Sequence, residues 1–164
     1  MSDTHFPYQE GKVAEITVSY ECSIPLEDRI QIRSSEDAEG ILRIIWAKDT
    51  LEYEERFYVL FLNRSNHVLG YMLHSIGGLN GTIGDAKQIL AVALKANAAS
   101  IILSHNHPSS NTSPSQADIQ LTAKITQGAS YLDLKVLDHI ILTKHGYYSF
   151  ADNGELPGGV SAVP

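Results

Sequence analysis

Two histidines separated by one residue, His105 and His107, stand at the end of a short apolar segment that is typical of a buried strand. Side chains at i and i+2 of an extended segment point to the same face, so both imidazoles can reach one point. Asp118 follows in the first turn of the next expected helix, where a short loop can return its carboxylate to the strand end. Two imidazoles and one carboxylate leave a fourth position for water, which is typical of catalytic zinc.

A zinc ion in such a site lowers the pKa of its water to roughly 7, and the chemistry then needs a proton acceptor that is not a ligand, normally Glu or Asp. Ser115 lies one helical turn before Asp118, and its hydroxyl can donate a hydrogen bond to a developing oxyanion. A His-x-His pair alone is weak evidence, because many surface histidines bind nothing. Pro108, the Ser-x-x-Asp spacing and the position between strand and helix together favour a metal site.

The strands that must position these residues are predicted from apolar alternation and β-branched or aromatic runs. They are expected at residues 13–20, 55–62, 67–74, 100–105, 135–142 and 147–150. The second and third of these flank an Asn-Arg-Ser-Asn turn, which predicts an antiparallel hairpin. The fourth is nearly all apolar, as expected at the centre of a sheet.

Helices are predicted from capping signals followed by apolar residues at helical spacing. Ser34 precedes a stripe that ends in Trp46, an expected core residue, and Asp85 precedes an Ala- and Leu-rich helix. Ser113 as N-cap and Pro114 as first helical residue are expected to begin the helix that carries Asp118. The order of elements predicts an α/β or α+β domain with helices covering a mixed sheet.

Composition places further bounds on function. The chain has 164 residues with a net charge of −7, from 12 Lys+Arg against 19 Asp+Glu, so one domain is expected and autonomous binding of nucleic acid is disfavoured. No apolar stretch is long enough to span a membrane, and the N-terminus lacks the pattern of a signal peptide. A cytoplasmic protein is therefore expected. Cys22 is the lone cysteine and cannot form an internal disulfide.

The segments Ser-His-Asn-His-Pro-Ser at 104–109 and Pro-Ser-Gln-Ala-Asp at 114–118 resemble the JAMM metal signature of the MPN/JAB superfamily, in its bacterial RadC-like branch. Glu-Arg-Phe at 55–57, Leu-Phe-Leu-Asn at 60–63, Asn-Ala-Ala at 97–99 and Leu-Asp-His-Ile-Ile at 137–141 resemble RadC-like segments in the same order. The signature usually has Gly after His-Asn-His-Pro-Ser, whereas this chain has Ser110. The resemblance predicts an N-terminal extension over 1–34, the MPN/JAB domain over 35–150 and a flexible tail over 151–164.

The resemblance implies a cytidine-deaminase-like α/β fold and a zinc-dependent hydrolase that acts on peptide or isopeptide bonds of a protein or peptide substrate. It implies further that His105, His107 and Asp118 bind zinc and that Ser115 stabilises the oxyanion. The glutamate that activates the water maps to Glu55. Glu54 is adjacent, and because side chains alternate along a strand only one of the two can face the site; the Glu-x-Phe pattern favours Glu55.

Two other functions remain open from the sequence. A RadC-like chain could be a DNA-repair or mobile-element accessory that binds nucleic acid or protein without hydrolysis, and an MPN domain could be an inactive interaction module. The net charge of −7 disfavours the first and the complete ligand set disfavours the second. His139, which follows Asp138 on an expected strand, is predicted either to support the metal ligands from behind or to have a purely structural role, with its imidazole hydrogen-bonded to the backbone, rather than to bind metal. The sequence leaves the oligomeric state and the substrate open.

Overall fold

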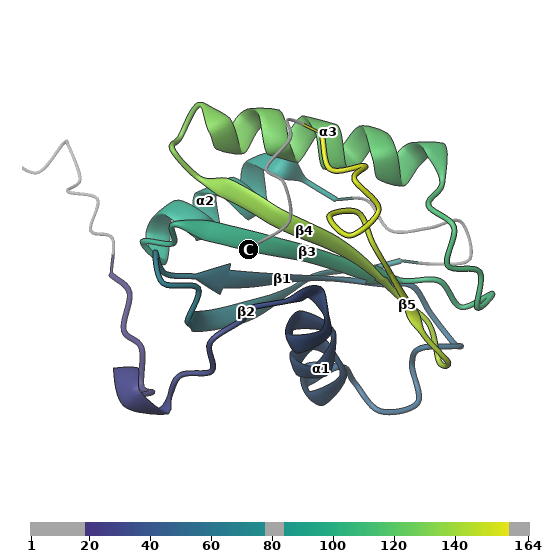
Figure 1. Ribbon diagram of the computed structural model, residues 1–164, viewed down its shortest axis with the longest axis horizontal. Coiled ribbons are helices and arrows are strands. Elements are labelled where there is room, and N and C mark those ends of the chain that lie inside the picture. The colour runs from purple at the N-terminus through teal and green to yellow at the C-terminus, as the bar shows by residue number, and fades with distance from the viewer. Residues whose placement is uncertain (1–18, 78–83, 158–164) are drawn as a thin grey trace, which may run out of the picture.

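The computed structural model describes residues 19–77 and 84–157, and these form a mixed sheet with helices on both faces (Figure 1). The strands are β1 (Arg56–Leu62), β2 (Val68–Ile76), β3 (Ser100–Asn106), β4 (Lys135–Leu142) and β5 (Tyr147–Ser149). The helices are a 3-10 turn η1 (Leu26–Asp28) and three α-helices, α1 (Ser35–Ile45), α2 (Ala86–Lys95) and α3 (Gln116–Ser130). The predicted α/β class with a mixed sheet flanked by helices is confirmed. The strand predicted at 13–20 falls mainly outside the described residues.

The sheet has the strand order β2-β1-β3-β4-β5. β1 is antiparallel to both β2 and β3, whereas β3 and β4 are parallel and are joined through α3. A parallel pair needs such a crossover connection, and here the connection carries the Asp118 end of the metal motif. The predicted hairpin of β1 and β2 is confirmed, and β3 lies at the centre of the sheet as its apolar sequence predicted.

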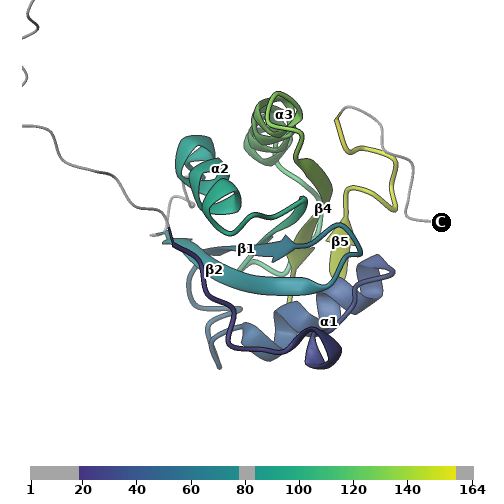
Figure 2. The ribbon, with the colours of Figure 1, turned by 90° about the vertical axis from the view of Figure 1, so that its left-hand side faces the viewer.

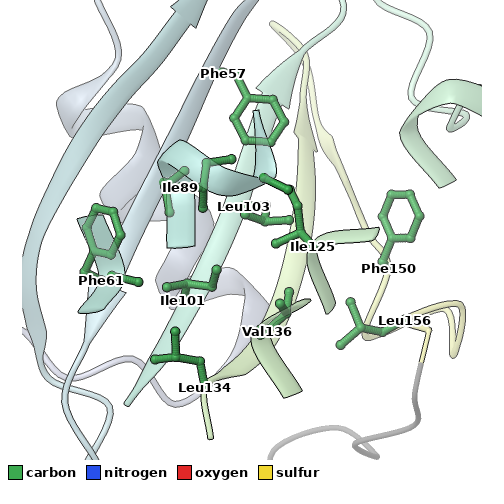
Figure 3. Packing of buried hydrophobic residues seen from close by; sticks show 14 of the residues in the cluster. Phe57, Phe61, Ile89, Ile101, Leu103, Ile125, Leu134, Val136, Phe150 and Leu156 are labelled. Carbon is green, nitrogen blue, oxygen red and sulfur yellow. The ribbon is translucent and has the colours of Figure 1, made fainter. Parts of the chain in front are cut away.

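Alternation along β1 divides the core into two layers. Phe57 and Phe61 face α2 and α3, while Tyr58 and Leu60 face α1. Figure 2 shows α2 and α3 on one side of the sheet and α1 on the other, and Figure 3 shows the side chains of the first layer packed together. Because β1 and β3 are buried on both faces, the ends of these strands are held rigidly, and the functional side chains project from those ends.

The helix starts follow the capping signals with one correction. Ser34 caps α1 by accepting from the Asp37 amide at 3.1 Å, and the Asp85 carboxylate caps α2. The prediction that Ser113 caps α3 was wrong: the N-cap is Ser115, two residues later. Asp118 stands three residues after Ser115 and completes a reciprocal capping box with it, which stabilises the helix start at Ser115.

The segments that flank the predicted domain are partly ordered against it. Ile32 is buried in the layer under α1, and Gln31 forms a bridge with His67 beside β2. Leu156, which lies in the segment predicted to be a flexible tail, is 7% exposed and packs in the layer under α3. Residues 158–164 lie outside the described part of the chain.

Candidate metal centre

The end of β3 and the first turn of α3 bring His105, His107 and Asp118 into one cluster. The potential ligand atoms of the three residues all lie within 4.8 Å of one another. His105 is 1% exposed and belongs to β3, while His107 follows directly after the strand ends. Asp118 is half-buried in the first turn of α3, where the loop from the strand returns it to the histidines. The structure thus juxtaposes the three residues that the sequence predicted as ligands.

The spacing of the two imidazole donor atoms is close to that of neighbouring ligands on a tetrahedral zinc ion. Two donors that each lie about 2.0–2.1 Å from such an ion are about 3.3 Å apart, the edge of the tetrahedron. The Nε2 atoms of His105 and His107 are 3.0 Å apart, and each faces a different oxygen of the Asp118 carboxylate: Oδ1 lies 3.2 Å from His105 Nε2, and Oδ2 lies 3.5 Å from His107 Nε2. Nitrogen and carboxylate oxygen are also donors that zinc accepts, so the residues present fit this metal.

The other nitrogen of each imidazole is occupied outside the cluster. His107 Nδ1 lies 2.7 Å from the Asn111 carbonyl, which can only accept, so Nδ1 carries the proton and donates it. His105 Nδ1 lies 2.8 Å from His139 Nε2 on β4. Both histidines therefore direct Nε2 toward Asp118, and their ring orientations are fixed from behind, as is usual for metal-binding imidazoles.

Asp118 has two tasks in the same place. Its Oδ2 accepts from the Ser115 amide at 2.7 Å, while its own amide donates to Ser115 Oγ at 3.2 Å. The capping box therefore fixes the carboxylate that faces the histidines. Burial alone raises the pKa of Asp118, but the neighbouring imidazoles of His105 and His107 outweigh burial and hold this pKa well below its usual range.

The groups around His107 favour its protonated form. A hydrogen bond from His107 to Asp118 raises the pKa of His107 most; burial opposes this, and the Asn111 carbonyl and the Glu55 charge add to it. A metal ion bound at His107 Nε2 would compete with a proton there, so metal binding should weaken as the pH falls.

Glu54 and Glu55 both line an open cleft together with His107 and Ser115. The Glu54 carboxylate accepts from Arg56 Nε at 2.7 Å and forms an ion pair with the same guanidinium. The Glu55 charge acts on the pKa of His107, as described above. The two neighbours therefore have different surroundings: Glu54 pairs with Arg56, whereas the charge of Glu55 raises the pKa of His107.

Asn106, between the two histidines of the motif, has a structural role that sequence analysis missed. Its side chain is fully buried and points away from the cluster. Oδ1 accepts from the Arg56 amide at 2.7 Å, and Nδ2 donates to the carbonyls of Leu51 and Glu54 at 2.8 and 2.9 Å. The amide therefore holds the backbone on both sides of Glu55. The available signal was its position in the motif, on the opposite face from His105.

Ser110 lies in the loop between the predicted ligands, at the position where the related signature usually has Gly. This residue has a φ of 60°, the left-handed conformation that favours glycine, and its amide donates to the His107 carbonyl at 2.9 Å. The loop thus has a conformation suited to the Gly that the related signature usually has, although the chain has Ser there. The ligand positions on either side are retained.

A mixed α/β sheet whose central strand ends in His-x-His, followed by a helix that begins with Ser-x-x-Asp, defines the class of the domain. The RadC-like JAB domain family matches residues 32–155, and the chain belongs to that family. A UPF0758 protein of Flavobacterium johnsoniae is 47% identical over 124 residues, which cover 76% of this chain and 53% of that protein. A UPF0758 protein of Fusobacterium nucleatum subsp. nucleatum is 39% identical over 114 residues, 70% of this chain and 49% of that protein.

A UPF0758 protein of Methanosarcina mazei is 33% identical over 147 residues, which cover 88% of this chain and 64% of that protein. The chain thus spans about half to two thirds of the length of these curated relatives. Within the described residues, none of the helices has the length and apolar character needed to cross a membrane.

Proposed function

We propose that this chain is a zinc-dependent hydrolase of JAMM type that cleaves peptide or isopeptide bonds in a protein or peptide substrate. The observation that carries the proposal is the convergence of two imidazole Nε2 atoms, 3.0 Å apart, on a carboxylate whose two oxygens lie 3.2 and 3.5 Å from them, a donor set that zinc accepts. His105, His107 and Asp118 would hold the ion. A zinc ion with an open fourth position supplies a water of lowered pKa and polarises a carbonyl group.

The residues around the cluster would move and stabilise charge. The Glu55 carboxylate, in the cleft beside His107, would accept a proton from the attacking water and deliver it to the leaving nitrogen. Ser115 also lines the cleft. Its hydroxyl oxygen accepts a hydrogen bond from the Asp118 amide, and its hydroxyl hydrogen would donate to the developing oxyanion. Glu54 is paired with Arg56 and would take no part in the transfer.

Metal analysis is the first test of this proposal. The purified protein should contain about one zinc per chain, and Asp118→Ala should lose it while its circular dichroism spectrum stays that of a folded protein. A folded wild-type protein that binds no zinc under saturating conditions would refute the metal site and the hydrolase together.

The second test separates the two neighbouring glutamates. The zinc-loaded protein is incubated with a peptide library and with lysine-branched isopeptides, and new termini are detected by mass spectrometry. Glu55→Gln should lower the rate by roughly 10²–10⁴-fold without changing zinc content, since it removes the proton acceptor. Glu54→Gln is the matched control and should retain activity. Equal effects of the two substitutions would contradict the assignment of the base.

The charge of the chain also predicts how it should bind nucleic acid. A net charge of −7 gives few cations to neutralise phosphates, so duplex and single-stranded DNA should bind weakly at both low and physiological salt. A sub-micromolar complex whose affinity falls steeply with salt would instead favour a role as a nucleic-acid accessory protein.

A further inference from the structure

His139 is a buried histidine that the proposed chemistry does not use. It lies on β4 with none of its side chain exposed, and its ring stacks on Phe150 with centroids 5.0 Å apart and planes at 13°. On one side its Nε2 lies 2.8 Å from His105 Nδ1, and on the other its Nδ1 lies 2.6 Å from Thr122 Oγ1. The ring therefore joins the central strand β3 to helix α3 directly behind the ligand cluster.

The direction of each bond in this chain can be deduced from its far end. Thr122 Oγ1 lies 2.6 Å from the Asp118 carbonyl, which can only accept, so the single hydroxyl hydrogen of Thr122 is donated there. Thr122 Oγ1 must then accept from His139, which places the His139 proton on Nδ1. A neutral His139 consequently accepts at Nε2, and His105 donates from Nδ1.

The consequence reaches the cluster itself. A His105 ring that carries its proton on Nδ1 has a lone pair on Nε2, the atom that faces the cluster and lies 3.0 Å from His107 Nε2. The His139 ring is fully buried against Phe150, where a charged imidazolium would be costly to desolvate, so a neutral ring completes the chain of bonds. The bonds also start at the backbone of one predicted ligand and end at the ring of another, so they tie Asp118 to His105.

We propose that His139 and Thr122 are positioning residues that fix His105 in the Nδ1–H tautomer, so that its Nε2 lone pair is preset for the metal. This inference rests on the proposed metal site. It goes beyond that site by assigning a task to two residues that would touch neither metal nor substrate. Partners of this kind typically change metal affinity 10–100-fold when they are removed.

A spectroscopic test needs no metal. In the metal-free protein labelled with ¹⁵N-histidine, two-bond and three-bond ¹⁵N–¹H correlations distinguish the two tautomers of each ring. His105 and His139 should both be Nδ1–H, and Thr122→Val should shift His105 away from that form. A wild-type His105 found mainly as Nε2–H would overturn the inference.

Zinc affinity gives the second readout, measured by competition with a chromophoric chelator. Thr122→Val keeps the shape but removes the hydroxyl and should weaken zinc binding 10–100-fold, while Thr122→Ser should restore it to within about threefold of wild type. Thr126→Val is the matched control, because the Thr126 hydroxyl is buried one turn further along α3 without a hydrogen-bond partner among the described residues. Its zinc affinity should equal that of the wild type.

The two proposals fail in different ways. If the wild type binds no zinc, the metal site is refuted, whereas the tautomer of His105 still tests the chain of bonds. If the wild type binds zinc and Thr122→Val binds it equally well, the site stands and the positioning role is wrong. A loss of affinity that Thr126→Val matches would also contradict it, since the effect would then be one of packing.

Discussion

Replacing Asn106 with alanine should separate the integrity of the ligand cluster from the placement of Glu55. The asparagine side chain makes three hydrogen bonds to backbone groups of the segment before and at the start of β1, and it is fully buried. Each such bond contributes about 0.5–1.5 kcal/mol net, and the alanine variant leaves one amide and two carbonyls without their partner. We expect the free energy of unfolding to fall by roughly 2–4 kcal/mol, a large share of the ~5–15 kcal/mol typical of a domain.

Urea unfolding followed by circular dichroism measures this loss, and amide hydrogen exchange at Arg56 should become faster. Asn63→Ala is the matched control: Asn63 Oδ1 accepts from the Ser65 and His67 amides at the opposite end of β1, so it is the same residue type in the same task. The control should lose about 1–2 kcal/mol, because only two bonds at a partly exposed turn are removed.

The functional readout distinguishes the two positions further. Asn106→Ala should bind zinc within about threefold of wild type, since the ligands retain their own supports, but its rate of hydrolysis should fall because the base is no longer held. Asn63→Ala should change neither. The reasoning is refuted if Asn106→Ala is destabilised no more than the control, or if it loses zinc affinity and activity in parallel.

Three further predictions concern stability. Ser110→Gly should raise the free energy of unfolding by up to about 1 kcal/mol in urea titrations, because glycine relieves the left-handed φ of 60°. Burial raises the pKa of Asp138, so the folded state binds this proton more tightly than the unfolded state does. The free energy of unfolding should therefore fall as the pH rises above about 4, by at most ~1.4 kcal/mol per pH unit. The difference between wild type and Asp138→Asn across a pH series should isolate this slope. Ser115→Ala and Ser34→Ala each remove a helix cap and should each cost about 1 kcal/mol, but only Ser115→Ala should also lower hydrolysis, by roughly 10²–10³-fold; equal activities would exclude the oxyanion role.

Much of the fold could be predicted because local signals agree with the tertiary structure. The apolar run of β1 predicts a buried strand, and Ser34 and Asp85 predict helix N-caps; the structure has all three. The start of α3 was harder to predict, since Ser113 and Ser115 both suit an N-cap and only the reciprocal bond with Asp118 decides between them.

Contacts between strands could not be predicted in the same way. His105 meets His139 because β3 and β4 pair in parallel with an irregularity between Ile101 and Ile102, and such a register leaves no mark in either strand alone. Asn106 was missed for a related reason: its partners lie about 50 residues earlier, on a segment that becomes its neighbour only when the sheet forms. The candidate ligands, by contrast, lie close together in sequence.

That contrast has a consequence for when each part of the site comes into being. The β3–α3 stretch carries all three candidate ligands, whereas Glu55 belongs to a segment delivered by the antiparallel pairing of β1 with β3. A fragment or an incompletely folded chain could capture an ion through the local stretch and still have no base beside it. We therefore expect hydrolytic activity to arise only when the sheet is complete, so that an incompletely folded chain cleaves no other protein.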